Sequence, residues 1–334
     1  MLKNNAIILT LAYPETIVRV SDEWFLQYMR YFGIGKKDYV RAGHAALVLI
    51  HKESRSLEYY DFGRYITPIP TGRVRSKETD HELDFPLKGI IRDGEIENLK
   101  DILKFLATHP HFTHGTGTLY ASVCDEVNYE HAKNHILEMQ QLSFIRYAAF
   151  LKEATNCARF VNDALIAGIT NQTIKRKLMK SKTFTASPIG NVVFADSKNK
   201  VYKVSDTGMI STFNSSVIKE HKQLFLDRLK DYEPNLVGTI DAKHDIEKHH
   251  SAQWLPGIGC GAWFELHDLN HDIEYRFRRV SPNGNVDVDG IYKISNGGFN
   301  ISFEYAFTHH SNCKFFHVKQ NGTIYRFEFL RKHE

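Results

Sequence analysis

A cysteine placed at the start of an amphipathic helix is the residue of this sequence best suited to chemistry. The stretch at 155–168 reads TNCARFVNDALIAG, and Cys157 directly follows Thr155 and Asn156, two good N-cap residues. Small and apolar residues recur behind it at helical spacing: Phe160, Val161, Ala164, Leu165 and Gly168. The pattern predicts a helix that packs on a sheet and carries the thiol at its N-terminus. There the helix dipole and the free N–H groups favour a thiolate and can bind a developing oxyanion.

A thiolate nucleophile also needs a base within hydrogen-bond reach and a group that orients this base. His44 opens the most apolar strand that we expect, HAALVLI, which is followed by the turn KESRS and the return strand LEYYDF. If this hairpin centres near Ser54, residue 44 lies opposite about residue 63 or 64, and Asp61 is the closest carboxylate. We therefore expect Cys157, His44 and Asp61 to act together, with Glu58 or a backbone carbonyl as alternatives to Asp61.

Each of these residues also has a purely structural interpretation. A lone cysteine on an apolar helix face is more often a small core residue, and a single histidine at a strand start is usually satisfied within the core or at an edge. The catalytic interpretation gains support because helix position, capping residues and a candidate partner all agree at Cys157.

The elements that must position these side chains suggest an α+β protein. The apolar run IILTLA near the N-terminus reads as a first strand, and helical patterns occupy 94–108 and 129–141 on either side of an expected strand at 116–123. These segments predict a first domain that combines an antiparallel sheet with the cysteine helix.

The character of the sequence changes after a polar and basic segment that ends at Pro188. We place a domain boundary there, which gives domains at 1–187 and 188–334. From Gly257 onward, short strands alternate with turns, and three Asn-Gly pairs are typical of hairpin turns: 283–284, 296–297 and 321–322. The second domain is therefore expected to be mostly antiparallel β, with one helix near 216–231.

Composition excludes several classes of function. The 334 residues are 42% hydrophobic and 25% charged, as in ordinary globular proteins, and a net charge of +4 is too mild to indicate a nucleic-acid partner. No apolar stretch approaches the roughly 20 residues that span a bilayer, and IILTLA is too short for a signal-peptide core. We therefore expect a soluble, cytoplasmic protein, and the sequence does not fix its oligomeric state.

Other cysteines and histidines give weaker patterns. The sequence HPHFTH with Cys124 lies in a Pro- and Gly-rich context without a metal-site spacing, so we expect no metal and no cofactor. The chain has no CxxC pair, which argues against a zinc ribbon, and pairing of Cys260 with Cys313 stays open.

The residues N156-C157-A158-R159-F160-V161 resemble the Asn-Cys-Glu-His-Phe-Val signature of the lecithin retinol acyltransferase-like proteins. These proteins belong to the circularly permuted group of the NlpC/P60 papain-like superfamily, in which the histidine strand precedes the cysteine helix, as GHAALVLI precedes TNCARFV here. The resemblance covers roughly 40–170, and it departs from the family at Ala158 and Arg159. The whole chain also resembles an uncharacterised family of bacterial two-domain proteins.

The resemblance implies a permuted papain-like domain with Cys157 as nucleophile and His44 as base. Asp61 is its weakest transfer, because the third residue of the family is often histidine. Tyr147 matches, by spacing, a tyrosine that assists the oxyanion, and Asn156 supports the same region. The implied activity is that of a cysteine peptidase or amidase acting on a peptide-like amide. A thiol acyltransferase, a lipid esterase and a silent binding or scaffold protein are the alternatives.

Overall fold

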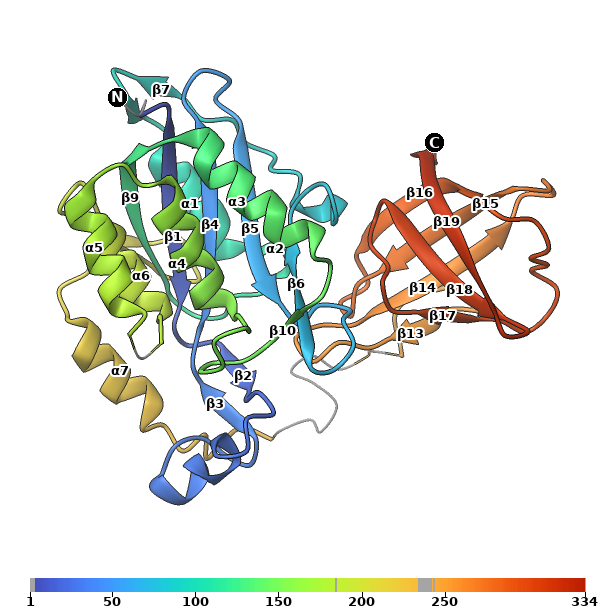
Figure 1. The fold of residues 1–334 in the computed structure, drawn as a ribbon, viewed down its shortest axis with the longest axis horizontal. Helices are drawn as coiled ribbons and strands as arrows, with labels where there is room; N and C mark the ends of the chain where they lie inside the picture. Colours follow the sequence, from blue (N-terminus) through green and yellow to red (C-terminus); the bar gives the residue numbers. More distant parts are fainter. Residues whose placement is uncertain (1–3, 184, 234–241, 243, 334) are drawn as a thin grey trace.

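The computed structural model describes residues 4–183, 185–233, 242 and 244–333, and it is an α+β structure with two main antiparallel sheets (Figure 1). The ends of the two expected domains, 1–3 and 334, lie outside the described residues. The first sheet has eight strands, in the spatial order β10 (Ile145–Arg146), β6 (Thr71–Arg75), β5 (Leu57–Gly63), β4 (His44–His51), β1 (Ala6–Tyr13), β9 (Leu119–Val127), β11 (Tyr202–Val204) and β12 (Ile210–Thr212).

The two central strands of this sheet are the two most apolar segments of the sequence. β1 contains the run IILTLA and pairs with β4 from Ala6 opposite His51 to Tyr13 opposite His44. Both strands are buried on both faces, as expected for strands covered by helices on each side. The predicted first strand and the predicted histidine strand are both confirmed, and the structure shows that they are neighbours in the sheet.

Helices cover both faces of the first sheet (Figure 1). One face packs against α3 (Tyr129–Gln141), α4 (Cys157–Gly168), α5 (Gln172–Ser181) and α6 (Pro188–Ala195). The other face packs against α1 (Leu99–Thr108) and α2 (Pro110–Thr113). Alternate residues of β4 supply the two cores, since Leu47 and Leu49 face the first group and Ala46 and Val48 face the second.

Helix α4 begins and ends where the sequence predicts. The side chain of Asn156 caps it by accepting a hydrogen bond of 3.0 Å from the N–H of Arg159. The predicted stripe is buried throughout: Phe160, Val161, Ala164, Leu165 and Gly168. At Gly168 a Cβ atom would lie 2.7 Å from Cβ of Ala132 on α3, so the two helices cross too closely for a larger residue.

Smaller elements complete this unit. β2 (Ile17–Arg19) and β3 (Tyr39–Arg41) form a two-stranded sheet, and β7 (Ile91–Arg92) and β8 (Glu95–Ile96) form another. The 3-10 helices η1 (Leu26–Phe32) and η2 (His81–Leu83) lie in the connections, and α7 (Val217–Phe225) packs beside β3. None of the helices in the described part of the chain is long and apolar enough to cross a membrane.

The two sheets do not separate at the boundary expected after residue 187. Strand β11 continues the first sheet by pairing with β9, with Tyr202 opposite Ala121. Helix α6 packs on β1 and β9, and its side chains Ile189 and Val192 form a small core with Ala12 and Tyr120. Residues 188–225 therefore belong to the first layered unit, because their apolar side chains complete its core, and the second sheet begins with β13 at Gln253.

The second sheet is formed by the C-terminal part of the chain, as predicted. Its order is β13 (Gln253–Leu255), β14 (Ala262–Asp268), β15 (Glu274–Val280), β16 (Val286–Ile294), β19 (Thr323–Lys332), β18 (Phe315–Gln320) and β17 (Ala306–Thr308). Asn321 and Gly322 have φ values of 48° and 82° between the paired residues Gln320 and Thr323, as a two-residue hairpin turn requires.

This sheet curls until its two edges nearly meet. The side chain of Gln253 on β13 donates to the carbonyl of Tyr305 at 2.9 Å and accepts from the N–H of Phe307 on β17 at 3.0 Å. One amide side chain thus bridges the gap between the edge strands. The interior is an aromatic core that includes Phe277, Tyr292 and Phe316, and it gives the unit a barrel-like shape.

Candidate active site

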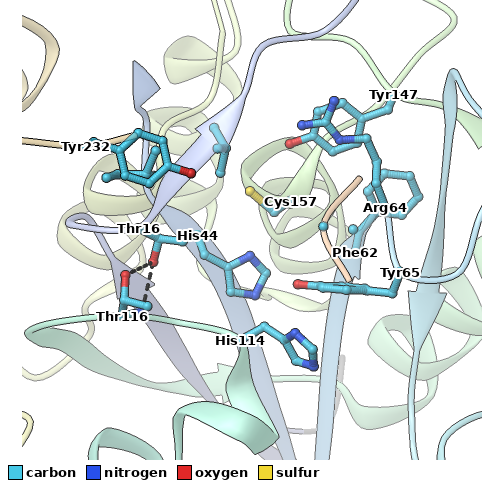
Figure 2. A pocket seen from close by; sticks show the side chains of 14 residues that line it. Thr16, His44, Phe62, Arg64, Tyr65, His114, Thr116, Tyr147, Cys157 and Tyr232 are labelled. Carbon is cyan, nitrogen blue, oxygen red and sulfur yellow. Dashed lines mark hydrogen bonds between the residues drawn. The ribbon is translucent and has the colours of Figure 1, made fainter. Parts of the chain in front are cut away.

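Cys157 and His44 line the same cavity, of about 220 Å³ (Figure 2). Cys157 comes from helix α4, which covers the sheet, and His44 comes from strand β4 within it. Helix α4 packs on one face, whereas Ala46 and Val48, which share the side of β4 on which His44 lies, point to the other face. The two side chains meet because His44 is the first residue of β4, at the end of the sheet, and Cys157 is the first residue of α4. Both are nearly buried, at 5% and 7% exposure.

Asp61 contacts the imidazole of His44. Its Oδ2 atom lies 3.2 Å from Nε2 of His44, and it is fully buried. Asp61 pairs with Ala46 across the hairpin, so residue 63 lies opposite His44, in the register expected from the sequence. An ionised carboxylate can only accept, so Nε2 carries the proton towards Asp61, and Nδ1 is left for Cys157.

Glu58, the alternative carboxylate of the same strand, lies on the other face of the sheet. It is opposite Leu49, and its carboxylate accepts hydrogen bonds from Lys133 at 2.6 Å and from Tyr129 at 2.8 Å. Burial alone would raise its pKa, but the bonds from Lys133 and Tyr60 hold the pKa below the usual value. Glu58 therefore ties α3 to the sheet and does not reach His44.

Arg75 and Tyr59 hold the carboxylate of Asp61 in its charged form. Arg75 donates from Nε to Oδ1 at 3.0 Å and from Nη2 to Oδ2 at 2.7 Å, and the hydroxyl of Tyr59 donates to Oδ2 at 3.1 Å. Burial would raise the pKa of Asp61, but the charge of Arg75 and the hydrogen bonds from His44 and Arg75 depress it well below the usual range. Asp61 is thus a permanent anion behind the imidazole.

This anion makes His44 a strong base. Burial alone would lower the pKa of His44, but hydrogen bonds with Asp61 and with the Cys157 thiol outweigh it and raise the pKa to about 9. An imidazole with this pKa can keep a proton taken from Cys157 at neutral pH. The arrangement therefore suits formation of a thiolate next to an imidazolium.

The raised pKa of His44 predicts a pH dependence of stability. Since the pKa is about 9 in the folded chain and about 6.5 in an unfolded one, protonation stabilises the fold fully below about pH 6.5 and no longer does so above pH 9. The shift corresponds to about 3 kcal/mol. Urea unfolding at a series of pH values should therefore show that the free energy of unfolding falls between about pH 6.5 and pH 9, and His44→Gln should lack this fall. Burial lowers the pKa of His317, so its ring signals in a histidine NMR titration provide an internal contrast. A His44 signal that titrates below pH 7 would contradict the prediction.

Donors for an oxyanion lie beside the sulfur. Helix geometry leaves the N–H groups of Cys157 and Ala158 without an acceptor inside α4. Tyr147 lines the same cavity as Cys157. Burial raises the pKa of Tyr147 above the usual value, and the nearby Cys157 adds to this effect, so the hydroxyl keeps its proton. The side-chain oxygen of Asn156 caps α4, and its NH2 group donates to the carbonyl of Ala148 at 3.2 Å, so both ends of the amide are used away from the sulfur. Asn156 thereby fixes α4 against the segment that carries Tyr147.

Several residues of the cavity were not identified from the sequence. Arg64 stacks on Tyr147 with its guanidinium 4.2 Å from the ring centre, and Arg75 stacks on Tyr65 at 4.0 Å. His114 lines the cavity next to His44 and Tyr65, and burial lowers its pKa well below the usual value. Arg64 and Tyr65 directly follow the return strand β5, so the hairpin was the signal that could have indicated them, whereas Arg75 lies on the next strand, β6, and lacks such a local signal.

The second sheet supports the wall of this cavity. Gly259 lines it and donates its N–H to the carbonyl of Arg64 at 2.9 Å, and the N–H of Ile66 donates to the carbonyl of Cys260 at 2.8 Å. Further along, Arg279 of β15 donates to Asp80 at 3.0 Å and to Glu82 at 2.6 Å. The C-terminal unit is therefore bonded directly to the strands that carry the candidate site.

The other cysteines and histidines form no further site in the described part of the chain. All four cysteines are described, and none forms a disulfide, so Cys260 and Cys313 are unpaired. Among the described residues, no group of three or more His, Cys, Asp or Glu side chains could hold a metal ion. His109 bonds to the carbonyl of Phe105 at 2.8 Å, and Cys124 is buried in the core of β9, away from a common centre.

Comparisons with known proteins assign two segments of the chain to families. Residues 8–174 match the family of type VI secretion system effector TseH-like proteins, and residues 252–330 match the DUF6695 C-terminal domain family. The crystal structure of a type VI secretion system effector, TseH, is similar at 17% sequence identity and a TM-score of 0.41, over 63% of this chain and 99% of that one. No curated protein matches this chain.

Proposed function

Because the chain belongs to the type VI secretion system effector TseH-like family, we propose that it acts as an effector and is a cysteine hydrolase that cleaves a peptide-like amide or a related ester. The observation that carries the proposal is the buried arrangement of Cys157, His44 and Asp61 around one cavity. We further propose that the first unit is a permuted papain-like catalytic domain, as the order of histidine strand and cysteine helix implies.

The proposed reaction uses each residue in turn. His44 takes the proton of Cys157 through Nδ1, and the thiolate attacks the carbonyl carbon. The N–H groups at the start of α4 and the hydroxyl of Tyr147 stabilise the oxyanion. His44 then protonates the leaving amine or alcohol, which departs and leaves a thioester. Water, deprotonated by His44, releases the carboxylic acid and restores the thiol.

Asp61 and Asn156 are positioning residues in this scheme. Asp61 keeps the imidazole in the tautomer that presents Nδ1 to the sulfur, and Asn156 holds α4 against the segment of Tyr147. An effector of a secretion system leaves the cell that makes it. Under this proposal, the cytoplasm expected from the sequence is where the chain is made and not where it acts.

Alkylation with iodoacetamide tests the proposal. We expect Cys157 to react at neutral pH at least about 100-fold faster than the other three cysteines, as measured by mass spectrometry of the peptides. Burial raises the pKa of Cys124 and of Cys260 to about 12, so these thiols serve as internal controls. His44→Ala should remove the advantage of Cys157, because the proton acceptor is lost.

The matched control is His51→Ala, which changes the histidine at the opposite end of the same strand. It should leave the labelling of Cys157 unchanged. Slow and equal labelling of all four cysteines would refute the hydrolase and favour the scaffold alternative. Rapid labelling with turnover only in the presence of an added amine or alcohol acceptor would favour the acyltransferase.

A further inference from the structure

A second and larger cavity, of about 610 Å³, is also lined by Cys157. Its walls come from η1, β3, α6 and α7, elements that lie together at one end of the first unit (Figure 1). Most of its lining is apolar, and includes Leu26, Met29, Val40, Ile189, Leu224 and Phe225. None of these elements is needed to bring Cys157, His44 and Asp61 together, so the catalytic arrangement does not explain the cavity.

Cys157 belongs to the lining of both cavities. Both cavities are lined by Cys157, Tyr147 and Val18, whereas His44 lines the smaller cavity and is not among the described residues that line the larger one. Ala158, whose N–H is a candidate oxyanion donor, lines the larger cavity. A carbonyl group at the sulfur would therefore have one substituent in each cavity.

This division fixes the direction of the substrate. The leaving amine or alcohol must lie next to the group that protonates it, which is His44, and so it occupies the smaller cavity. The acyl part then extends into the larger one. We propose, on the basis of the hydrolase function proposed above, that the larger cavity is an acyl-binding pocket and that the substrate is an amide or ester of an extended, uncharged, apolar carboxylic acid.

The size of the cavity argues against a single amino-acid side chain as its occupant. An apolar cavity of roughly 150 Å³ holds one benzene molecule. The volume of about 610 Å³ is about four times larger and suits an aliphatic chain of many carbons. Each methylene group of such a chain that leaves water for the cavity stabilises the complex.

The charges around the cavity agree with an uncharged occupant. Arg41 is already bound, with Nε 2.8 Å from Asp227 and Nη1 2.9 Å from the carbonyl of Glu15. Burial lowers the pKa of His221, so this side chain of α7 is neutral at physiological pH. Arg19 also contributes to the lining, and it is engaged in an interaction within the chain.

The reaction consumes only the substrate and one water molecule. The thiolate forms a C–S bond to the acyl carbon, and the C–N or C–O bond breaks as the leaving group takes the proton held by His44. One water molecule then adds to the thioester carbon, the C–S bond breaks, and the products are the fatty acid-like carboxylic acid and the free thiol.

A series of p-nitrophenyl esters tests the pocket with the full chain. We expect kcat/KM to rise at least about tenfold from the acetate through the butyrate to the octanoate, because each added methylene group is buried. Met29→Trp, which fills the cavity, should lower the octanoate-to-acetate ratio at least about fivefold. The matched control is Met209→Trp, at a side chain with 72% exposure outside the cavity, and it should keep the ratio.

The controls separate a failure of the pocket from a failure of the hydrolase. Iodoacetamide labelling of Cys157 is measured in parallel on each protein. Rapid labelling together with equal kcat/KM for all three esters would overturn the acyl pocket and leave the hydrolase standing. Absence of rapid labelling would overturn both proposals. If Met29→Trp does not fold, the ester series on the unchanged protein still decides the inference.

Discussion

Replacing Asp61 by asparagine is expected to lower kcat/KM for ester hydrolysis by about 100- to 10,000-fold. The neutral amide removes the anion that holds His44 protonated, so the pKa of His44 falls from about 9 towards its ordinary value. The amide group can also turn its NH2 towards Nε2, which would favour the wrong tautomer of the imidazole. Steady-state rates with p-nitrophenyl acetate measure the fall in kcat/KM, and a histidine NMR titration measures the fall in the pKa of His44.

Glu58→Gln is the matched control for this substitution. It makes the same chemical change on the same strand, but at a carboxylate that binds Lys133 and Tyr129 on the other face of the sheet. It should leave kcat/KM within about twofold of the unchanged protein. If Asp61→Asn also left the rate within this range, Asp61 would have no role in orienting His44, and the proposed mechanism would fail at its third residue.

The local part of the site was predictable from the sequence because short-range patterns determine it. The hairpin from His44 to Asp61 has one turn segment, KESRS, between two apolar strands, so counting residues from an assumed centre near Ser54 gave its register to about one residue. The cap at Asn156 and the stripe behind Cys157 likewise follow from helix rules. Whether the histidine strand and the cysteine helix meet was a separate question, since nothing local connects residues so far apart.

The support around the site was not predictable, because it depends on contacts between distant segments. Arg75 reaches Asp61 only because β6 pairs with β5, and a sequence cannot distinguish it from any surface arginine. The extent of the first sheet was not predictable for the same reason. The turn-rich pattern after Pro188 resembles the C-terminal strands, but β11 pairs with β9 and completes the first sheet.

A buried ion cluster joins the two units directly behind the candidate site. Asp80 is bound by Arg73 at 2.6 Å and by Arg279 at 3.0 Å, and Arg279 also binds Glu82 at 2.6 Å. Arg279 is 1% exposed, and Arg75, the partner of Asp61, lies 3.9 Å from Glu82. The chain of charges therefore runs from β15 of the second sheet through Glu82 and Arg75 to Asp61.

Removing Arg279 is expected to leave buried carboxylates without their counter-charge. Asp80 is 1% exposed, and although burial would raise its pKa, the charges of Arg73 and Arg279 hold the pKa well below the usual value, so this carboxylate stays ionised. Arg279→Met should therefore lower the free energy of unfolding by about 3 to 5 kcal/mol, measured by urea denaturation at neutral pH. The matched control is Arg276→Met on the same strand. Arg276 also forms two hydrogen bonds with one carboxylate, that of Asp289, but its side chain is 28% exposed. Its loss should lower the free energy of unfolding by at most about 1 kcal/mol.

The Arg279 substitution also tests whether the C-terminal unit acts on the catalytic residues. If the charge chain positions Arg75, the folded fraction of Arg279→Met should show a lower His44 pKa in the NMR titration, because Asp61 loses part of its support. Arg276→Met should leave that pKa unchanged. A large loss of stability with an unaltered His44 titration would limit Arg279 to a structural role, and a loss of less than about 1 kcal/mol would show that the cluster does not hold the units together.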